Sequence, residues 1–131
     1  MRSYKQYCGV AQALDLVGQR WTLLLVRDLL PGPRRYSDLL DALPGITTNL
    51  LADRLRELVS AGLIEKRTLP APAGSAVYAL TPRGQALEDV ILALGRFGEQ
   101  YLVAPGDDRV DFRWFAVSLR RRFRSDDPRP F

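Results

Sequence analysis

The stretch of sequence that decides the fold is residues 44–62, PGITTNLLADRLRELVSAG. Its Pro-Gly start favours a turn, and Thr47 or Thr48 can cap a helix by accepting an otherwise unpaired backbone N–H. Leucines then recur at helical spacing, so we expect a helix over residues 49–61. Gly62 is suited to end it, because glycine takes up the left-handed backbone at a helix C-terminus at little steric cost.

This expected helix has one apolar and one polar face. Leu51, Leu55 and Leu58, flanked by Leu50, are expected in the core. The opposite face carries the following side chains: Asn49, Ala52, Asp53, Arg56 and Ser60. Asn and Arg pair with adenine and guanine edges in the major groove, so this face is a candidate DNA contact, the alternative being an ordinary solvated surface.

Arg54 lies near the leucine side of the same helix. We therefore expect it to be structural and to pair with a carboxylate such as Asp38 or Asp41.

Further elements extend in both directions from this helix. Before it we expect helices over residues 10–17, 20–30 and 37–43, with an extended piece at 34–36. After it come strands at 63–69 and 76–80, joined by the loop 70–75, and a helix over 82–103 that begins at Thr81 and Pro82. This order predicts a mainly α fold with a small β-hairpin, the winged helix-turn-helix. We assign residues 1–104 to this domain and 105–131 to a C-terminal amphipathic helix and tail.

The expected helix 82–103 has more apolar surface than so small a domain can cover. The stripe comprises Val90, Ile91, Leu94, Phe97, Tyr101 and Leu102. Leaving it wet would expose a large patch, so we predict a dimer interface there, the alternative being packing within one chain. The helix 10–17 and the region around Trp114 are the expected companions. The tail is expected to pack on the dimer, with contact to DNA or an acidic partner as the alternative.

Composition excludes several classes of function. The 131 residues include no histidine and one cysteine, so neither a Ser-His-Asp triad nor a Cys-His pair exists, and a zinc site of the usual kind is excluded within one chain. We expect a protein that is not an enzyme and has no cofactor, no metal and no membrane partner, located in the cytoplasm. The formal net charge is +4, and nearly all of the basic residues are arginines. Both features suit a nucleic-acid partner.

Several segments agree in order and spacing with one known family. They are LVGQRWTLLLVRDLL (16–30), RYSDL (35–39), the stretch 44–58, AGLI (61–64), YALTPRG (78–84) and LGRFG (94–98). On these residues the chain resembles the HxlR-type branch of MarR-like winged-helix transcription regulators. The resemblance implies a homodimeric DNA-binding regulator, usually a repressor, which leaves its operator on a chemical signal. The hairpin tip 70–75 departs from the family pattern because it has no charge.

We expect the DNA contacts to combine base and phosphate recognition. The helix would present Thr47, Thr48, Asn49, Asp53 and Arg56 to the double-stranded operator. Phosphates would be neutralised by Arg34, Arg35, Lys66, Arg67 and Arg83, each steepening the salt dependence of binding. The alternative function is an oligomerising or adaptor winged-helix module that binds no operator.

Cys8 is the candidate signal receiver. It is expected at the start of the first helix, where the helix dipole favours the thiolate. The resemblance implies that a cysteine at this place senses oxidants or electrophiles in some relatives. The alternative role for Cys8 is that of a small buried apolar residue. The alternative signal is a small-molecule inducer bound elsewhere.

Overall fold

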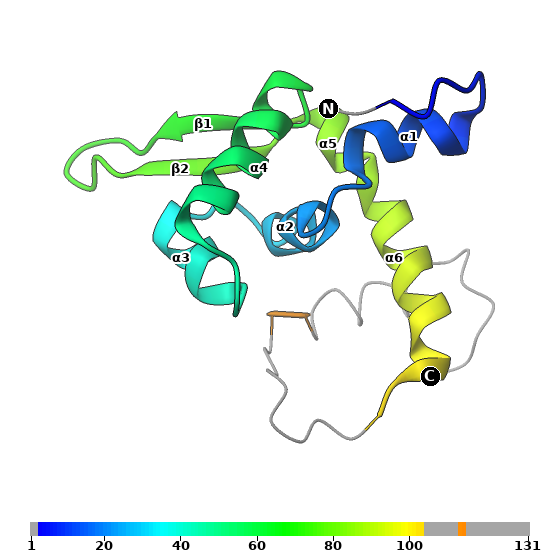
Figure 1. The fold of residues 1–131 in the computed structure, drawn as a ribbon. Helices are drawn as coiled ribbons and strands as arrows, with labels where there is room; N and C mark the ends of the chain where they lie inside the picture. The colour runs from blue at the N-terminus through cyan, green and yellow to red at the C-terminus, as the bar shows by residue number, and fades with distance from the viewer. Residues whose placement is uncertain (1–2, 104–112, 115–131) are drawn as a thin grey trace.

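The computed structural model describes residues 3–103 and 113–114 of the chain. The elements follow one another as α1 (Gly9–Val17), α2 (Thr22–Leu29), α3 (Tyr36–Ala42), α4 (Thr48–Ser60), β1 (Ile64–Thr68), β2 (Ala76–Leu80), α5 (Pro82–Gln85), α6 (Leu87–Gly98) and the 3-10 turn η1 (Glu99–Tyr101). Figure 1 shows the β1–β2 hairpin extending to one side of the helices and α6 on the other. This arrangement confirms the winged helix-turn-helix prediction.

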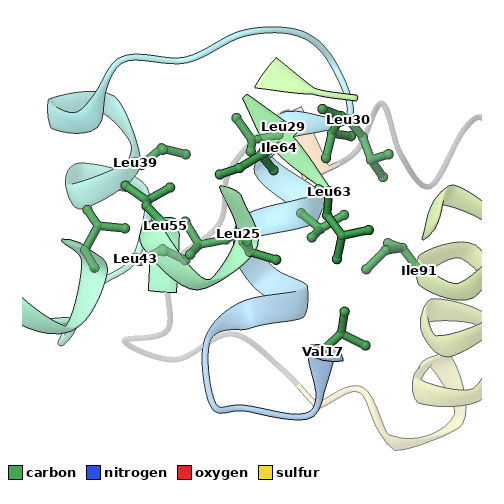
Figure 2. Packing of buried hydrophobic residues seen from close by; sticks show 14 of the residues in the cluster. Val17, Leu25, Leu29, Leu30, Leu39, Leu43, Leu55, Leu63, Ile64 and Ile91 are labelled. Carbon is green, nitrogen blue, oxygen red and sulfur yellow. The ribbon is translucent and has the colours of Figure 1, made fainter. Parts of the chain in front are cut away.

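Helix α2 lies at the centre of the core. Leu25, Val26 and Leu29 are almost fully buried on it, and leucines of α3 and α4 pack around them (Figure 2). Ile64 of β1 and Ile91 of α6 close the same cluster from the wing and from the last long helix. One leucine of α2, Leu24, remains 42% exposed.

The wing is a short antiparallel hairpin with a third point of attachment. Its register pairs Ile64 with Leu80 and Thr68 with Ala76. Arg34 forms an isolated bridge with Tyr78, in which each backbone N–H donates to the other residue's carbonyl at 2.9 and 2.7 Å. The segment leading into α3 is thereby fixed to β2. The extended piece expected at 34–36 is one residue shorter, because α3 begins at Tyr36.

The helix expected over residues 82–103 is divided. Thr81 caps α5 by accepting the Gly84 N–H at 3.1 Å, and its hydroxyl donates to the Gly62 carbonyl at 2.6 Å. The helix start is thus fastened to the end of α4. At Ala86 the ψ angle of −18° is closer to that of a 3-10 helix than to that of an α-helix. Helix α5 therefore ends at Gln85, and α6 begins at Leu87. The packing of α5 on the hairpin and of α6 on α2 explains why one unbroken helix does not form.

Part of the expected C-terminal helix lies outside the described residues. Of residues 110–122, the structure describes Arg113 and Trp114, both with helical backbone. Within the described part of the chain, no helix combines the length and apolar character needed to cross a membrane.

Candidate nucleic-acid interface

Helix α4 presents a polar face to solvent because its leucines are committed to the core. Leu51, Leu55 and Leu58 are buried, as predicted. The residues expected on the opposite face are exposed in four cases, Asn49, Asp53, Arg56 and Ser60, and half-buried in the case of Ala52. The amphipathic prediction for this helix is confirmed.

The amino end of α4 is held by two hydrogen bonds. Thr47 is the cap, since its Oγ1 accepts the Leu50 N–H at 3.1 Å. The Tyr36 hydroxyl of α3 donates to the Thr48 carbonyl at 2.8 Å and so joins the two helices of the helix-turn-helix. Gly45, with φ +95°, makes the turn between them, a backbone conformation that favours glycine. Thr47, Thr48 and Asn49 are all exposed at this end, where backbone N–H groups also favour an anion.

Arg35 and Asp38 form an ion pair at the start of α3. The Arg35 guanidinium donates to both carboxylate oxygens of Asp38, at 3.1 and 3.2 Å, and the Arg35 backbone N–H donates to Oδ2. These hydrogen bonds hold the pKa of Asp38 below its ordinary value of 3.8 and raise the pKa of Arg35. Because the Asp38 pKa is lowered, the stabilisation from this pair is present above the ordinary value and is lost as pH falls through the lowered one.

Arg54 is structural and pairs with a carboxylate, as predicted, but that carboxylate is Glu57 rather than one of the two named from the sequence. Its Nε donates to the Arg20 carbonyl at 2.9 Å and its Nη1 to Glu57 at 3.1 Å, whereas Asp38 is paired with Arg35. The hydrogen bond to the Arg20 carbonyl fastens α4 to the α1–α2 connection.

The other cations predicted to contact DNA lie on α4, on the wing and at the end of α4. Arg56 is ion-paired with Asp53 on the exposed face, and Arg67 pairs with Glu65 on the wing at 3.0 Å. Lys66 lies over the Tyr78 ring, and Arg83 lies beside Gly62 at the end of α4. Exposed pairs of this kind contribute little to stability, so a phosphate can replace the carboxylate at small cost. Arg34 is half-buried beside Tyr78, which makes it less accessible than the others.

A groove between α4 and the wing has two of these cations, Arg56 and Lys66, in its lining. It has a volume of about 510 Å³ and is lined by Leu55, Arg56, Val59, Ser60, Lys66 and Tyr78. Sequence analysis missed Val59 and Tyr78 as lining residues. The alternation of buried and exposed residues in β2 held the signal for Tyr78, since it places that ring on the face opposite Val77 and Ala79.

Most of the predicted dimer stripe is exposed, but one member is not. Val90, Leu94, Phe97, Tyr101 and Leu102 are between 46% and 78% exposed. Ile91 is only 8% exposed and belongs to the core of its own chain, because it points toward α2; its assignment to the interface is corrected.

The two regions expected to join the stripe in the interface, α1 and the region around Trp114, differ in the structure. On α1, Val10 and Leu14 are exposed, although periodicity alone would bury them. Trp114 contacts α2 of the same chain through Arg27 and Asp28, so it does not continue the exposed stripe. Phe115 lies outside the described residues.

Cys8 precedes α1 directly and is exposed, so the alternative of a buried apolar residue is wrong. It borders a hollow of about 180 Å³ with Tyr4, Gln6, Val10, Ala11 and Leu14.

The fold and the exposed α4 define a protein of the helix-turn-helix regulator class. The model of the HxlR-like helix-turn-helix family matches residues 16–105, and the chain belongs to that family. It is a transcriptional regulator of the HxlR/MarR type, and the expectation that it is not an enzyme is confirmed by this membership.

Three relatives illustrate the similarity. The HTH-type transcriptional regulator YodB of Bacillus subtilis is 34% identical over 95 residues, covering 72% of this chain and 84% of YodB. Its quinone-bound crystal structure matches with a TM-score of 0.60 at 30% identity, covering 70% of this chain and 96% of that one. A MarR-family regulator from Porphyromonas gingivalis matches with a TM-score of 0.68 and 30% identity, covering 78% and 100%. The oxidised form of the redox regulator HypR matches with a TM-score of 0.67 and 28% identity, covering 74% and 100%.

Proposed function

We propose that the chain acts as a homodimeric, sequence-specific repressor that places α4 in the major groove of operator DNA. The observation that carries the proposal is the exposed polar face of α4 opposite three buried leucines. Asn49 and Arg56 would contact bases, with Thr47, Thr48 and Asp53 beside them. Arg34, Arg35, Lys66, Arg67 and Arg83 would contact phosphates on either side.

Dimerisation would use the exposed apolar surfaces of α6 and α1. Burying a side chain such as Leu94 or Phe97 contributes about 1.5–3 kcal/mol each, so pairing of this stripe is strongly favoured over exposure to water. A two-fold axis would then present two α4 helices to successive major grooves, about 34 Å apart.

The signal in this proposal is an oxidant or an electrophile acting at Cys8. The exposed thiol, the adjacent hollow and the similarity to the oxidised HypR and quinone-bound YodB structures support it. An electrophile would add to the Cys8 sulfur at the start of α1, which belongs to the proposed dimer surface. A change there would alter the separation of the two α4 helices.

Selection of bound sequences from a random duplex pool, followed by titrations at several salt concentrations, tests DNA binding. Arg56→Ala is expected to weaken specific binding by about 1–3 kcal/mol and to relax preference at one base pair. Lys66→Ala is expected to weaken all sequences alike and to reduce the salt slope by about 0.9 for each phosphate that is no longer neutralised. Lys5→Ala, which removes the same charge from the segment before α1, is the matched control.

Failure to enrich any sequence at any salt concentration would support the adaptor function instead. The uncharged wing tip is the observation that favours this second candidate. If DNA binds, addition of a quinone or peroxide should release it from the wild-type protein and spare Cys8→Ser. Equal release from both proteins would eliminate the thiol as the signal receiver.

A further inference from the structure

Asp28 is a buried carboxylate in the last turn of α2, and no role was predicted for it from the sequence. The residue is 3% exposed. Arg27 donates to both of its oxygens, from Nε to Oδ1 at 3.1 Å and from Nη2 to Oδ2 at 3.3 Å. The Trp114 indole N–H donates to the same Oδ1 at 3.0 Å. A carboxylate removed from water needs such donors, because an unpaired buried charge is costly.

The indole ring is held on a second side by the same arginine. The Arg27 guanidinium carbon lies 4.1 Å from the centre of the Trp114 ring. This is a cation–π contact with a partly buried cation, since the Arg27 side chain is 18% exposed. Arg27 and Asp28 therefore recognise two properties of one group, the face of a flat aromatic ring and an N–H at its edge.

We propose that Arg27 and Asp28 form a binding site for planar aromatic molecules with a ring N–H, and that Trp114 occupies it in the intact chain. Trp114 lies beyond residues 16–105, the part matched by the family model. Figure 1 draws the described pair 113–114 in orange and α2 in blue, which marks their separation along the chain. Occupation of the site by Trp114 fastens the described pair 113–114 to the central helix of the domain. The proposal does not depend on DNA binding.

Indole itself is the probe for the vacated site. Trp114→Ala is expected to lower the Tm by roughly 4–8 °C, as for a modest destabilisation of a small domain, because the half-buried ring loses its contacts with Arg27 and Asp28. Millimolar indole should restore part of that loss, and calorimetry should detect its binding. The matched ligand 1-methylindole, which has the ring but lacks the N–H donor, should restore much less. The wild-type protein, whose site is filled by Trp114, should respond weakly to either.

The double variant Asp28→Asn/Trp114→Ala tests the carboxylate. Asparagine keeps the size of the side chain but removes the charge, so indole should bind it at least tenfold more weakly than it binds Trp114→Ala. Equal indole binding to both variants, or equal effects of indole and 1-methylindole, would overturn the proposal.

A measurement on the folded wild-type protein covers the case in which Trp114→Ala does not fold. The chain has two tryptophans, so its ¹H–¹⁵N spectrum has two indole resonances, and Trp114→Phe identifies one of them. The Trp114 N–H is expected to exchange slowly with solvent and to shift in Asp28→Asn. Exchange as fast as that of free indole would contradict its placement on Asp28.

Discussion

At the scale of single residues, Thr47 and Thr48 show how position decides the role of a side chain. They are adjacent and both exposed, yet the Thr47 hydroxyl caps α4, whereas Thr48 is the first residue of the helix and accepts the Tyr36 hydroxyl through its backbone carbonyl. Removing the Thr48 side chain leaves that carbonyl in place. The two threonines therefore form a matched pair for separating the stability of α4 from its proposed contacts with DNA.

Thr47→Ala is expected to lower the free energy of unfolding by about 1 kcal/mol, because one backbone N–H at the start of α4 loses its acceptor. Thr48→Ala should cost clearly less. Urea denaturation at one fixed protein concentration measures both, so that coupling between folding and assembly cancels. Equal losses for the two variants would show that the Thr47 cap does not stabilise α4.

Arg54 and Arg56 show which side-chain roles sequence analysis could predict. Their positions on the helical wheel correctly separate a structural arginine from an exposed one. The Arg20 carbonyl could not be predicted as a partner of Arg54, because it lies 34 residues away and any backbone carbonyl can accept an N–H. Glu57 could have been predicted, because residues three apart are neighbours on a helix surface. No role was predicted for Asp28 for a similar reason: in the sequence it follows Arg27 near the end of an apolar helix, and its hydrogen-bond donor Trp114 comes 86 residues later.

At the scale of elements, α5 and α6 are two separate helices where a single helix was expected. Gly84 explains why α5 packs so tightly on the hairpin, since a Cβ built there would lie 1.9 Å from the Leu63 carbonyl oxygen. Only a residue without a side chain permits this approach. Helix periodicity predicted the apolar positions of this region well, but it contains no information about where a backbone must tighten to meet a neighbouring strand.

Gly84→Ala is therefore expected to destabilise the fold by about 3 kcal/mol, near the upper end of the usual cost of overpacking. Gly98→Ala is the matched control within the same helical region. A Cβ at Gly98 meets nothing within 4 Å, and alanine favours the helix, so a gain of up to about 1 kcal/mol is expected. Thermal and urea unfolding compare the two, and a Gly84→Ala protein as stable as the wild type would contradict the close packing at Leu63.

At the scale of the whole molecule, the exposed apolar stripe on α6 was predicted from the sequence with one residue too many, because Ile91 is buried. Helical spacing identifies all apolar residues on one side of a helix. It does not tell which of them pack on the same chain and which remain available to a partner chain. Ile91 turns toward α2, whereas Leu94 and Phe97 remain exposed. The division depends on where α6 crosses α2, which is a property of the assembled domain.

The double variant Leu94→Asp/Phe97→Asp is expected to be monomeric, because each carboxylate would have to be buried without a partner in the proposed interface. Light scattering coupled to size exclusion measures the mass directly. Leu69→Asp, which changes an exposed leucine beside the wing loop, is the matched control and should keep the mass of the wild type. A wild-type monomer, or a double variant with unchanged mass, would remove α6 from the interface.

In the proposed function, pairing through the exposed stripe on α6 makes DNA binding depend on the concentration of the chain. If only paired chains hold DNA, operator occupancy at low expression follows the square of the monomer concentration, by mass action. Halving synthesis would then reduce the bound form roughly fourfold. A gene under such control responds to dosage with a threshold, and that threshold is set by the apolar side chains of one helix rather than by any contact with a base.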